Sequence, residues 1–150
     1  MIKANLKNCI YLEDQSLQIF GYKIYGSPWQ TPHLWAAFQR NSDTLKQIWS
    51  KIPDDVDILM THGPPYKQLD KTRKGVDTGC PHLLKEVLTR VKPILHCFGH
   101  IHESYGASSY DDVLFINSAF CDSRYKPVQP PFIIDLPYRE PQKEEHMEEP

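Results

Sequence analysis

The sequence lacks a paired-cysteine motif, because its four cysteines are scattered and none forms a Cys-x-x-Cys pair. This pattern argues against a disulfide framework and against a zinc site built from thiolates. Cys9 and Cys97 each stand beside apolar residues, so we expect small buried side chains at both positions. We expect free thiols throughout the chain, at Cys9, Cys80, Cys97 and Cys121.

Long apolar runs are also missing, and no segment approaches the roughly 20 residues that a transmembrane helix needs. Residues 1–7 lack the apolar stretch of a secretory signal peptide. Neither sign of charge dominates, since the formal net charge is -2. A chain without a basic excess has no general attraction for nucleic acid or for an anionic membrane. We therefore expect a cytoplasmic protein that binds small molecules.

The composition is that of a folded protein with a short polar tail. Hydrophobic residues make up 40% and charged residues 24% of the 150 positions, which is ordinary for a globular domain. Glutamates gather near the carboxyl end, where apolar residues are almost absent. We expect one domain over residues 1–138 and an acidic, disordered tail over residues 139–150.

The apolar pattern predicts an α/β protein with short strands and two amphipathic helices. Residues 8–12, 17–20 and 22–26 have the composition of strands joined by tight turns, as in an antiparallel meander. Residues 27–35 combine two prolines with two tryptophans, so we expect an irregular aromatic loop.

Helical spacing of apolar residues then predicts a helix from Ser42 or Asp43 to Pro53, and a second from Cys80 to Pro93. Further strands are predicted at residues 56–60, 93–98, 113–117 and 132–136. Residues 66–79 are rich in lysine and glycine and indicate a basic, solvated surface loop.

Three histidines follow two of these strands. His100 and His102 share one side of an extended segment, because side chains two residues apart point the same way. His62 ends the strand at residues 56–60. A strand, helix, strand order favours a right-handed crossover between parallel neighbours, which brings the three imidazoles together at their carboxyl ends. His96 falls on the same face, and we expect it in the core or supporting the ligands.

Neutral imidazole suits zinc, manganese, iron or copper, whereas magnesium and calcium prefer oxygen. A His-x-His pair alone is most often structural, and the second histidine strengthens the case for a metal. Three histidines and one water would also suffice for a mononuclear zinc hydrolase, although no general base is visible. His33 and His82 have no neighbouring ligand type, and we expect them to be structural or exposed.

The segments at residues 61–65 (Thr-His-Gly-Pro-Pro) and 98–103 (Phe-Gly-His-Ile-His-Glu) resemble the last two motifs of the calcineurin-like metallophosphoesterases. Residues 8–30 and 117–137 resemble its metallophosphoesterase domain-containing subgroup, which is related to class III cyclic-nucleotide phosphodiesterases. The resemblance implies a four-layer α/β/β/α fold that hydrolyses small phosphoric esters at two divalent ions, manganese, iron or zinc. By matching position, His62 and His100 would ligate one ion and His102 the other.

The family's earlier motifs, Asp-x-His, Gly-Asp and Gly-Asn-His, do not occur in this sequence. The chain therefore resembles the carboxy-terminal half of the domain, a partial sandwich with part of the dinuclear site. We assign no catalytic side chain. We expect this chain alone to be inactive unless a missing amino-terminal half or self-association completes the site. The alternative is a catalytically inactive, truncated binding or regulatory module that retains at most one metal.

Overall fold

The computed structural model describes residues 6–33 and 36–140, and within them six strands form one mixed sheet. The order across the sheet is β1-β2-β3-β4-β6-β5. The central strands β2, β3, β4 and β6 run parallel, and an antiparallel strand closes each edge. The strands are β1 Gln15–Ile19, β2 Tyr22–Ser27, β3 Ile58–Thr61, β4 Leu95–Phe98, β5 Gly106–Tyr110 and β6 Val113–Asn117.

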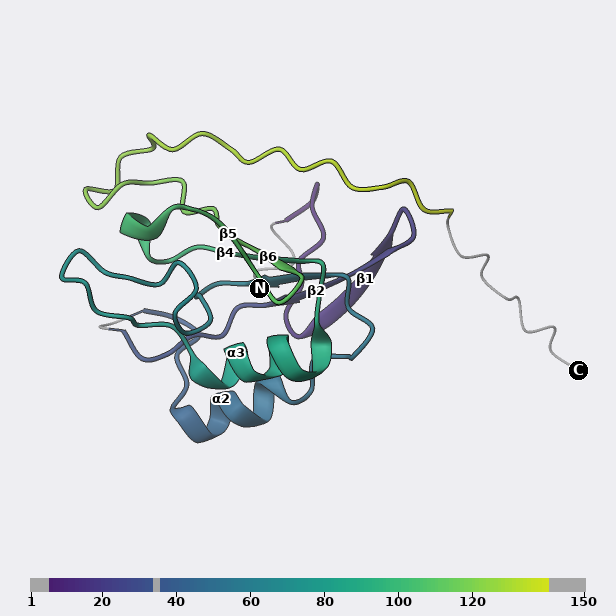
Figure 1. The fold of residues 1–150 in the computed structure, drawn as a ribbon, viewed down its shortest axis with the longest axis horizontal. Coiled ribbons are helices and arrows are strands. Elements are labelled where there is room, and N and C mark those ends of the chain that lie inside the picture. The colour runs from purple at the N-terminus through teal and green to yellow at the C-terminus, as the bar shows by residue number, and fades with distance from the viewer. Residues whose placement is uncertain (1–5, 34–35, 141–150) are drawn as a thin grey trace, which may run out of the picture.

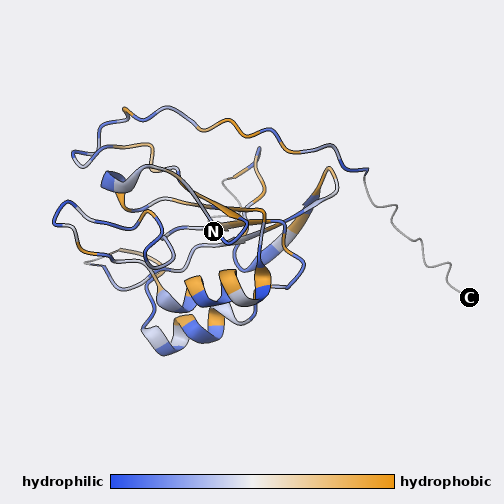
Figure 2. Ribbon diagram, in the orientation of Figure 1, coloured by the Kyte–Doolittle hydropathy of each residue, from blue (hydrophilic) through white to orange (hydrophobic). Residues whose placement is uncertain are grey.

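Two helices cover one face of this sheet (Figure 1). Helix α2, Ser42–Trp49, connects β2 to β3, and α3, Pro81–Glu86, continues as a π-helical turn, η1 Val87–Val91, towards β4. A short 3-10 turn, η2 His102–Ser104, follows β4. Apolar and polar residues alternate along α2 and α3 (Figure 2), as expected for helices with one buried face. The carboxyl-terminal segment runs along the other side of the molecule (Figure 1).

The core lies between the helices and the sheet. Leu59, His96 and Phe115 occupy one register row across β3, β4 and β6, and all three are completely buried. Trp49 from α2 belongs to the same buried cluster, and its indole Nε1 donates to the Cys80 Sγ at 3.3 Å. The two helices are thus joined to each other as well as to the sheet.

The predicted helix ends shift slightly. Asn41, rather than Ser42 or Asp43, caps α2, because its side chain accepts from the Thr44 N–H at 2.9 Å. The second helix ends at Lys92, which adopts the left-handed conformation immediately before Pro93. Both helices and the parallel neighbours β3 and β4 were correctly predicted.

Two predicted strands are wrong. Residues 8–12 form no strand, because the segment crosses the sheet face: a Cβ on Gly26 would lie 2.5 Å from the Leu12 Cβ. The expected meander is therefore a two-stranded hairpin of β1 and β2. Residues 132–136 are extended without a strand partner, and nearby side chains anchor this segment instead. Phe132 stacks on Tyr105 at 4.8 Å, and the Tyr22 hydroxyl donates to the Pro137 carbonyl.

The cysteines are free thiols, as predicted. Cys9, however, is exposed rather than buried, because it belongs to the segment that crosses the sheet face without entering the core. The end of the aromatic loop at residues 34–35 and the tail over residues 141–150 lie outside the described residues. Within the described ranges, no helix combines the length and apolar character needed to cross a membrane.

One arginine ties the two helical segments together. The Arg90 guanidinium donates to the carbonyl of Trp49, the last residue of α2, at 3.0 Å, and to the Ile52 carbonyl just beyond the helix. It also contacts the carboxylates of Asp54 and Glu86. The Trp49 carbonyl also accepts from the Ile52 N–H at 3.2 Å, so Arg90 adds a second donor there and acts as a side-chain cap for the Ile52 carbonyl.

Replacing Arg90 with methionine should lower the free energy of unfolding by about 1–3 kcal/mol, because the Ile52 carbonyl loses its donor and the Trp49 carbonyl loses one of its two donors. Lys85→Met, at an exposed position on α3, should change it by less than about 0.5 kcal/mol. Urea denaturation measures both variants. Equal stability of the two variants would contradict the capping role of Arg90.

Candidate metal centre

The two histidine loops meet because their strands are parallel neighbours. Strand β3 ends at Thr61 and β4 at Phe98, and both strands run in the same direction. The Gly99 N–H donates to the His62 carbonyl at 3.0 Å and joins the two loops directly. The carboxyl ends of parallel strands thus bring residues 38 positions apart in sequence into contact.

His62 and His100 face each other through ring nitrogens. The His62 Nε2 lies 3.2 Å from the His100 Nδ1, and the ring centroids are 4.9 Å apart. His100 has a φ of 70°, a conformation that is uncommon outside glycine and concentrates at functional sites. The backbone therefore adopts a strained conformation at the residue that brings this imidazole towards the His62 loop.

His102 lies on the 3-10 turn η2 and is held by a different loop. Its Nδ1 lies 2.8 Å from the Asp122 carbonyl, which only accepts, so this nitrogen carries the proton. The ring also packs edge-on against Tyr125 at 5.2 Å. In the neutral ring the other nitrogen, Nε2, then has a free lone pair. Metal-ligating histidines are commonly oriented in this way.

A fourth histidine, His33, approaches the same place. Its ring meets that of His100 edge-on, with centroids 5.1 Å apart. The sequence predicted only a structural or exposed role, and the side chain is exposed. Nothing in the sequence indicated the contact with His100, because the path of the irregular loop at residues 27–33 cannot be inferred from a periodic pattern.

The environment favours neutral imidazoles. Burial, together with the charges of His62, His33 and His102, lowers the pKa of His100 to about 4. Burial also lowers the pKa of His62, with a smaller contribution from His102. His62 is exposed on its outer side, so solvent should reduce its shift relative to that of His100. Both rings thus have a free nitrogen lone pair at neutral pH, which is the form that binds metal.

The histidine pair fits one metal ion, but the ligand set around it is incomplete. Two nitrogen ligands of a tetrahedral zinc ion, each about 2.0–2.1 Å from it, lie about 3.4 Å apart, close to the 3.2 Å seen here. Within residues 6–33 and 36–140, no three His, Cys, Asp or Glu side chains are close enough together to hold a metal ion. Ligation by His62, His100 and His102 stays a prediction.

A polar cavity of about 280 Å³ adjoins His100. Its walls come from the aromatic loop and the basic loop, and they include Thr31, His33, Thr72 and Thr78. The cavity borders His100 of the imidazole pair, and three threonines line it. The cavity is thus one candidate space for a ligand of this site, and a second of about 370 Å³ adjoins His62.

The basic loop at residues 66–79 is organised by one buried carboxylate that no residue pattern in the sequence indicated. Asp70 is 1% exposed, and its Oδ2 accepts from the Lys67 N–H at 2.9 Å and the Gly79 N–H at 2.8 Å. The Thr78 hydroxyl donates to the Asp70 carbonyl at 3.0 Å. The tip of the loop at residues 73–76 is exposed, as predicted, whereas its base forms a fixed wall of the polar cavity.

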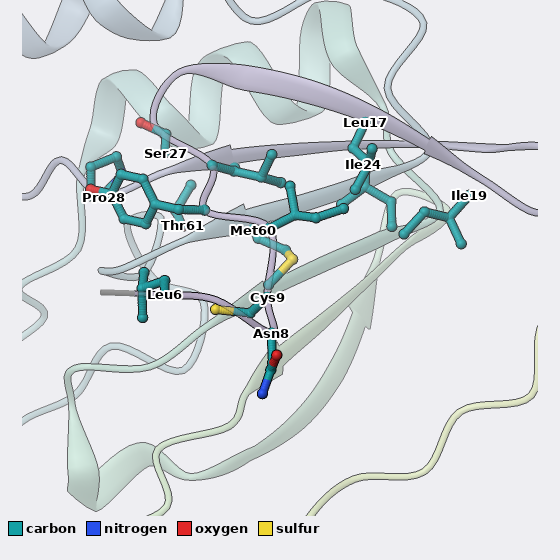
Figure 3. Close-up of a pocket in the computed structure, with 14 residues that line it drawn as sticks. Leu6, Asn8, Cys9, Leu17, Ile19, Ile24, Ser27, Pro28, Met60 and Thr61 are labelled. Carbon is teal, nitrogen blue, oxygen red and sulfur yellow. The ribbon is translucent and has the colours of Figure 1, made fainter. Parts of the chain in front are cut away.

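A larger cavity of about 650 Å³ lies elsewhere, between the segment at residues 6–12 and the sheet (Figure 3). Leu17, Ile24 and Met60 line it with mostly apolar surface. None of the four histidines near the strand ends lines this cavity. Its size therefore says nothing about the chemistry at the strand ends.

The two histidine loops meet at the carboxyl ends of parallel strands, which is where open α/β sheets commonly bind ligands. The family model for calcineurin-like phosphoesterases matches residues 9–104. The chain belongs to the calcineurin-like phosphoesterase family. This family membership confirms the resemblance found in the two histidine motifs.

Two curated relatives are similar along most of the chain. The human Metallophosphoesterase domain-containing protein 1 is 44% identical over 138 residues, which are 91% of this chain and 42% of that protein. A UPF0046 protein from Caenorhabditis elegans is 39% identical over 137 residues, 88% of this chain and 48% of that protein. The chain spans less than half the length of these relatives, and it groups with the metallophosphoesterase domain-containing proteins.

One solved crystal structure shares the fold, with a TM-score of 0.55 and 14% identity over 72% of this chain and 45% of that chain. At this identity the likeness concerns the fold alone. The α/β class is thus confirmed, and the described residues form one sheet covered by helices on one face. These are two of the four layers that an α/β/β/α sandwich contains.

Proposed function

We propose that this chain provides the histidine ligands of a metal-dependent phosphoric ester hydrolase, a phosphodiesterase or phosphatase, at a site that it completes only in part. The contact between the His62 Nε2 and the His100 Nδ1, 3.2 Å apart and from two separate loops, carries this proposal. A metal ion between the rings would accept a lone pair from each nitrogen in place of the hydrogen bond that now joins them.

In this proposal His62 and His100 hold one divalent transition metal, and His102 contributes to a second. Manganese, iron and zinc all suit imidazole ligands. When bound, such ions supply Lewis acidity to phosphoryl oxygens and lower the pKa of water. The hydrogen bond from His102 Nδ1 to the Asp122 carbonyl keeps the other ring nitrogen available as a ligand.

The protein side chains would orient a small phosphoester rather than attack it. The cavity beside His100 is lined by Thr31, His33, Thr72 and Thr78, whose polar groups suit a phosphoryl oxygen or a polar leaving group. The near-neutral net charge again disfavours nucleic acid as the substrate. Four free cysteines agree with a cytoplasmic location, which is part of this proposal.

The remaining ligands must come from outside the described set, because His62 and His100 have no third His, Cys, Asp or Glu close enough within it. The family's amino-terminal half would supply carboxylates, and a second copy of the chain is the other possible source. Two imidazoles alone should hold a metal weakly, since a zinc ion takes four ligands. The proposal therefore expects weak metal binding by the chain alone.

The test measures metal content and hydrolysis together. The chain is dialysed against Mn²⁺, and the number of metal ions per chain is measured. Hydrolysis of an aryl phosphate diester and of a monoester is then measured for the chain alone and for an amino-terminally extended protein. We expect Mn²⁺-stimulated turnover from the extended protein and its loss in the His102→Ala variant. An extended protein that stays inactive with every divalent metal would refute the proposed hydrolase function.

A second candidate is a catalytically inactive binding or regulatory module that holds at most one metal. It is favoured by the same incomplete ligand set, because one imidazole pair without a third close ligand suits a single weak ion. Binding of one metal ion per chain without hydrolysis, in the extended protein as well, would support this function. Binding of two ions with hydrolysis would contradict it.

A further inference from the structure

A buried hydrogen-bond relay lies behind His62 and connects its loop to the next strand. The Thr61 hydroxyl donates to the Gly63 carbonyl at 2.8 Å, across the residue that carries the imidazole. The same hydroxyl oxygen lies 2.9 Å from the His96 Nε2. Both contacts are buried. The relay thus runs from β4, through the last residue of β3, to the far side of the His62 turn.

The directions of these hydrogen bonds follow from counting protons. A hydroxyl has one hydrogen, and the Thr61 hydroxyl gives it to the Gly63 carbonyl, which only accepts. The Thr61 oxygen must therefore accept from His96, so the Nε2 of His96 carries the proton. One tautomer of His96 satisfies the relay, and the other leaves two acceptors facing each other.

The surroundings of His96 keep it in this state. Its ring is completely buried and packs against Phe98 at 5.0 Å and Phe115 at 5.8 Å. Its other nitrogen, Nδ1, is buried and has no hydrogen-bond partner, which is the expected state of an unprotonated ring nitrogen among aromatic side chains. Among the described residues, the ring of His96 therefore makes one hydrogen bond, the donation to Thr61.

The relay fixes the backbone on both sides of His62. The bond from Thr61 to Gly63 closes a tight turn with His62 at its centre, and the Gly99 N–H holds the His62 carbonyl at 3.0 Å. His62 is itself exposed, so few packing contacts define its direction. The buried hydroxyl compensates for that exposure by restricting the turn from which the imidazole projects.

We propose that Thr61 and His96 are positioning residues that aim the His62 imidazole at His100, so that the two nitrogens can share one metal ion. This inference rests on the proposed metal-dependent function and assigns roles to two residues outside the ligand set. Neither residue touches the metal in this arrangement. Their effect is on the orientation of a ligand, which commonly changes metal affinity by about 10–100-fold.

The test compares Thr61→Val, which removes the hydroxyl at nearly constant shape, with Thr61→Ser, which retains it. Mn²⁺ titration of the full chain should show affinity at least about tenfold weaker for Thr61→Val, and within about twofold of wild type for Thr61→Ser. Val113→Ala, in the core at the start of β6, controls for lost stability and should keep wild-type affinity. Thermal melting accompanies each titration.

If Thr61→Val does not fold, His96→Phe replaces it, because phenylalanine suits the aromatic surroundings and lacks the N–H donor. Wild-type affinity in a folded variant without the relay would overturn the inference. So would an equal loss in Val113→Ala, which would assign the effect to stability alone. A wild-type chain that binds no Mn²⁺ would instead refute the proposed function, and the role of the relay with it, so the two failures are distinguishable.

Discussion

Replacing His100 with alanine is expected to lower the affinity of the chain for Mn²⁺ by more than about 100-fold, beyond the usual effect of a residue that only supports a ligand. The reason is the nitrogen pair: one of two donors 3.2 Å apart is removed, and the described residues hold no third close ligand to compensate. Isothermal titration of the full chain with Mn²⁺ measures the change.

The matched control is His82→Ala. His82 lies at the start of α3, where its Nε2 is 3.0 Å from the Ser42 hydroxyl, and it belongs to neither histidine loop. This variant loses one imidazole but should bind Mn²⁺ as wild type does. Equal losses in the two variants would mean that the chain binds the metal through scattered surface histidines rather than at the predicted centre.

The pH dependence gives the same prediction a second measurement. An imidazole with an ordinary pKa of 6.5 would start to lose metal to protons just below neutral pH. In the folded chain the pKa of His100 is lowered to about 4 by burial and neighbouring histidines. Neutral His100 therefore persists well below pH 6.5, and protons compete for this ring only as the pH approaches 4, while the pKa of His62 is lowered as well. Mn²⁺ affinity that falls tenfold per pH unit from pH 6.5 would contradict this.

The contact between His62 and His100 was predictable because parallel neighbouring strands end at the same edge of a sheet. This rule concerns the centre of the sheet, where every strand has partners on two sides. The alternation expected for His100 and His102 was wrong, because His100 has a φ of 70° and His102 lies on the 3-10 turn η2 rather than in an extended segment. His96, which we expected in the core or supporting the ligands, is completely buried.

The failures lie where tertiary contacts outweigh local preference. Residues 8–12 have a strand-like composition, but Leu12 packs over Gly26 on the sheet face and the segment pairs with no edge. His33 reaches His100 through a loop without periodicity. The carbonyl that orients His102 belongs to Asp122, 20 residues further along the chain. Each of these contacts depends on the path of an irregular segment, which no residue pattern encodes.

Acidification from pH 7.5 to pH 5 is expected to remove about 2 kcal/mol of stability through His96 alone. Complete burial lowers the pKa of this ring to about 3, from an ordinary value of 6.5 in the unfolded chain. Between these two values the unfolded state binds a proton that the folded state does not. The contribution is therefore fully present above pH 6.5 and is lost as the pH falls from 6.5 towards 3.

Other groups also titrate in this range, so the prediction is a difference between two proteins. In His96→Gln the side chain keeps an N–H near Thr61 but does not ionise, and all other titrating groups remain. Urea unfolding at pH 7.5 and pH 5 should show a stability loss about 2 kcal/mol larger for wild type than for the variant. Equal losses would mean that His96 can be protonated in the folded state.

A spectroscopic measurement separates these cases without relying on a variant. The His96 ring resonances of the folded wild-type protein should not change between pH 7.5 and pH 5, because the pKa of about 3 lies below this range. If His96 stays neutral while stability falls, the buried ring that supports the His62 turn also makes the fold sensitive to acid. Loss of that turn at low pH would then accompany unfolding rather than precede it.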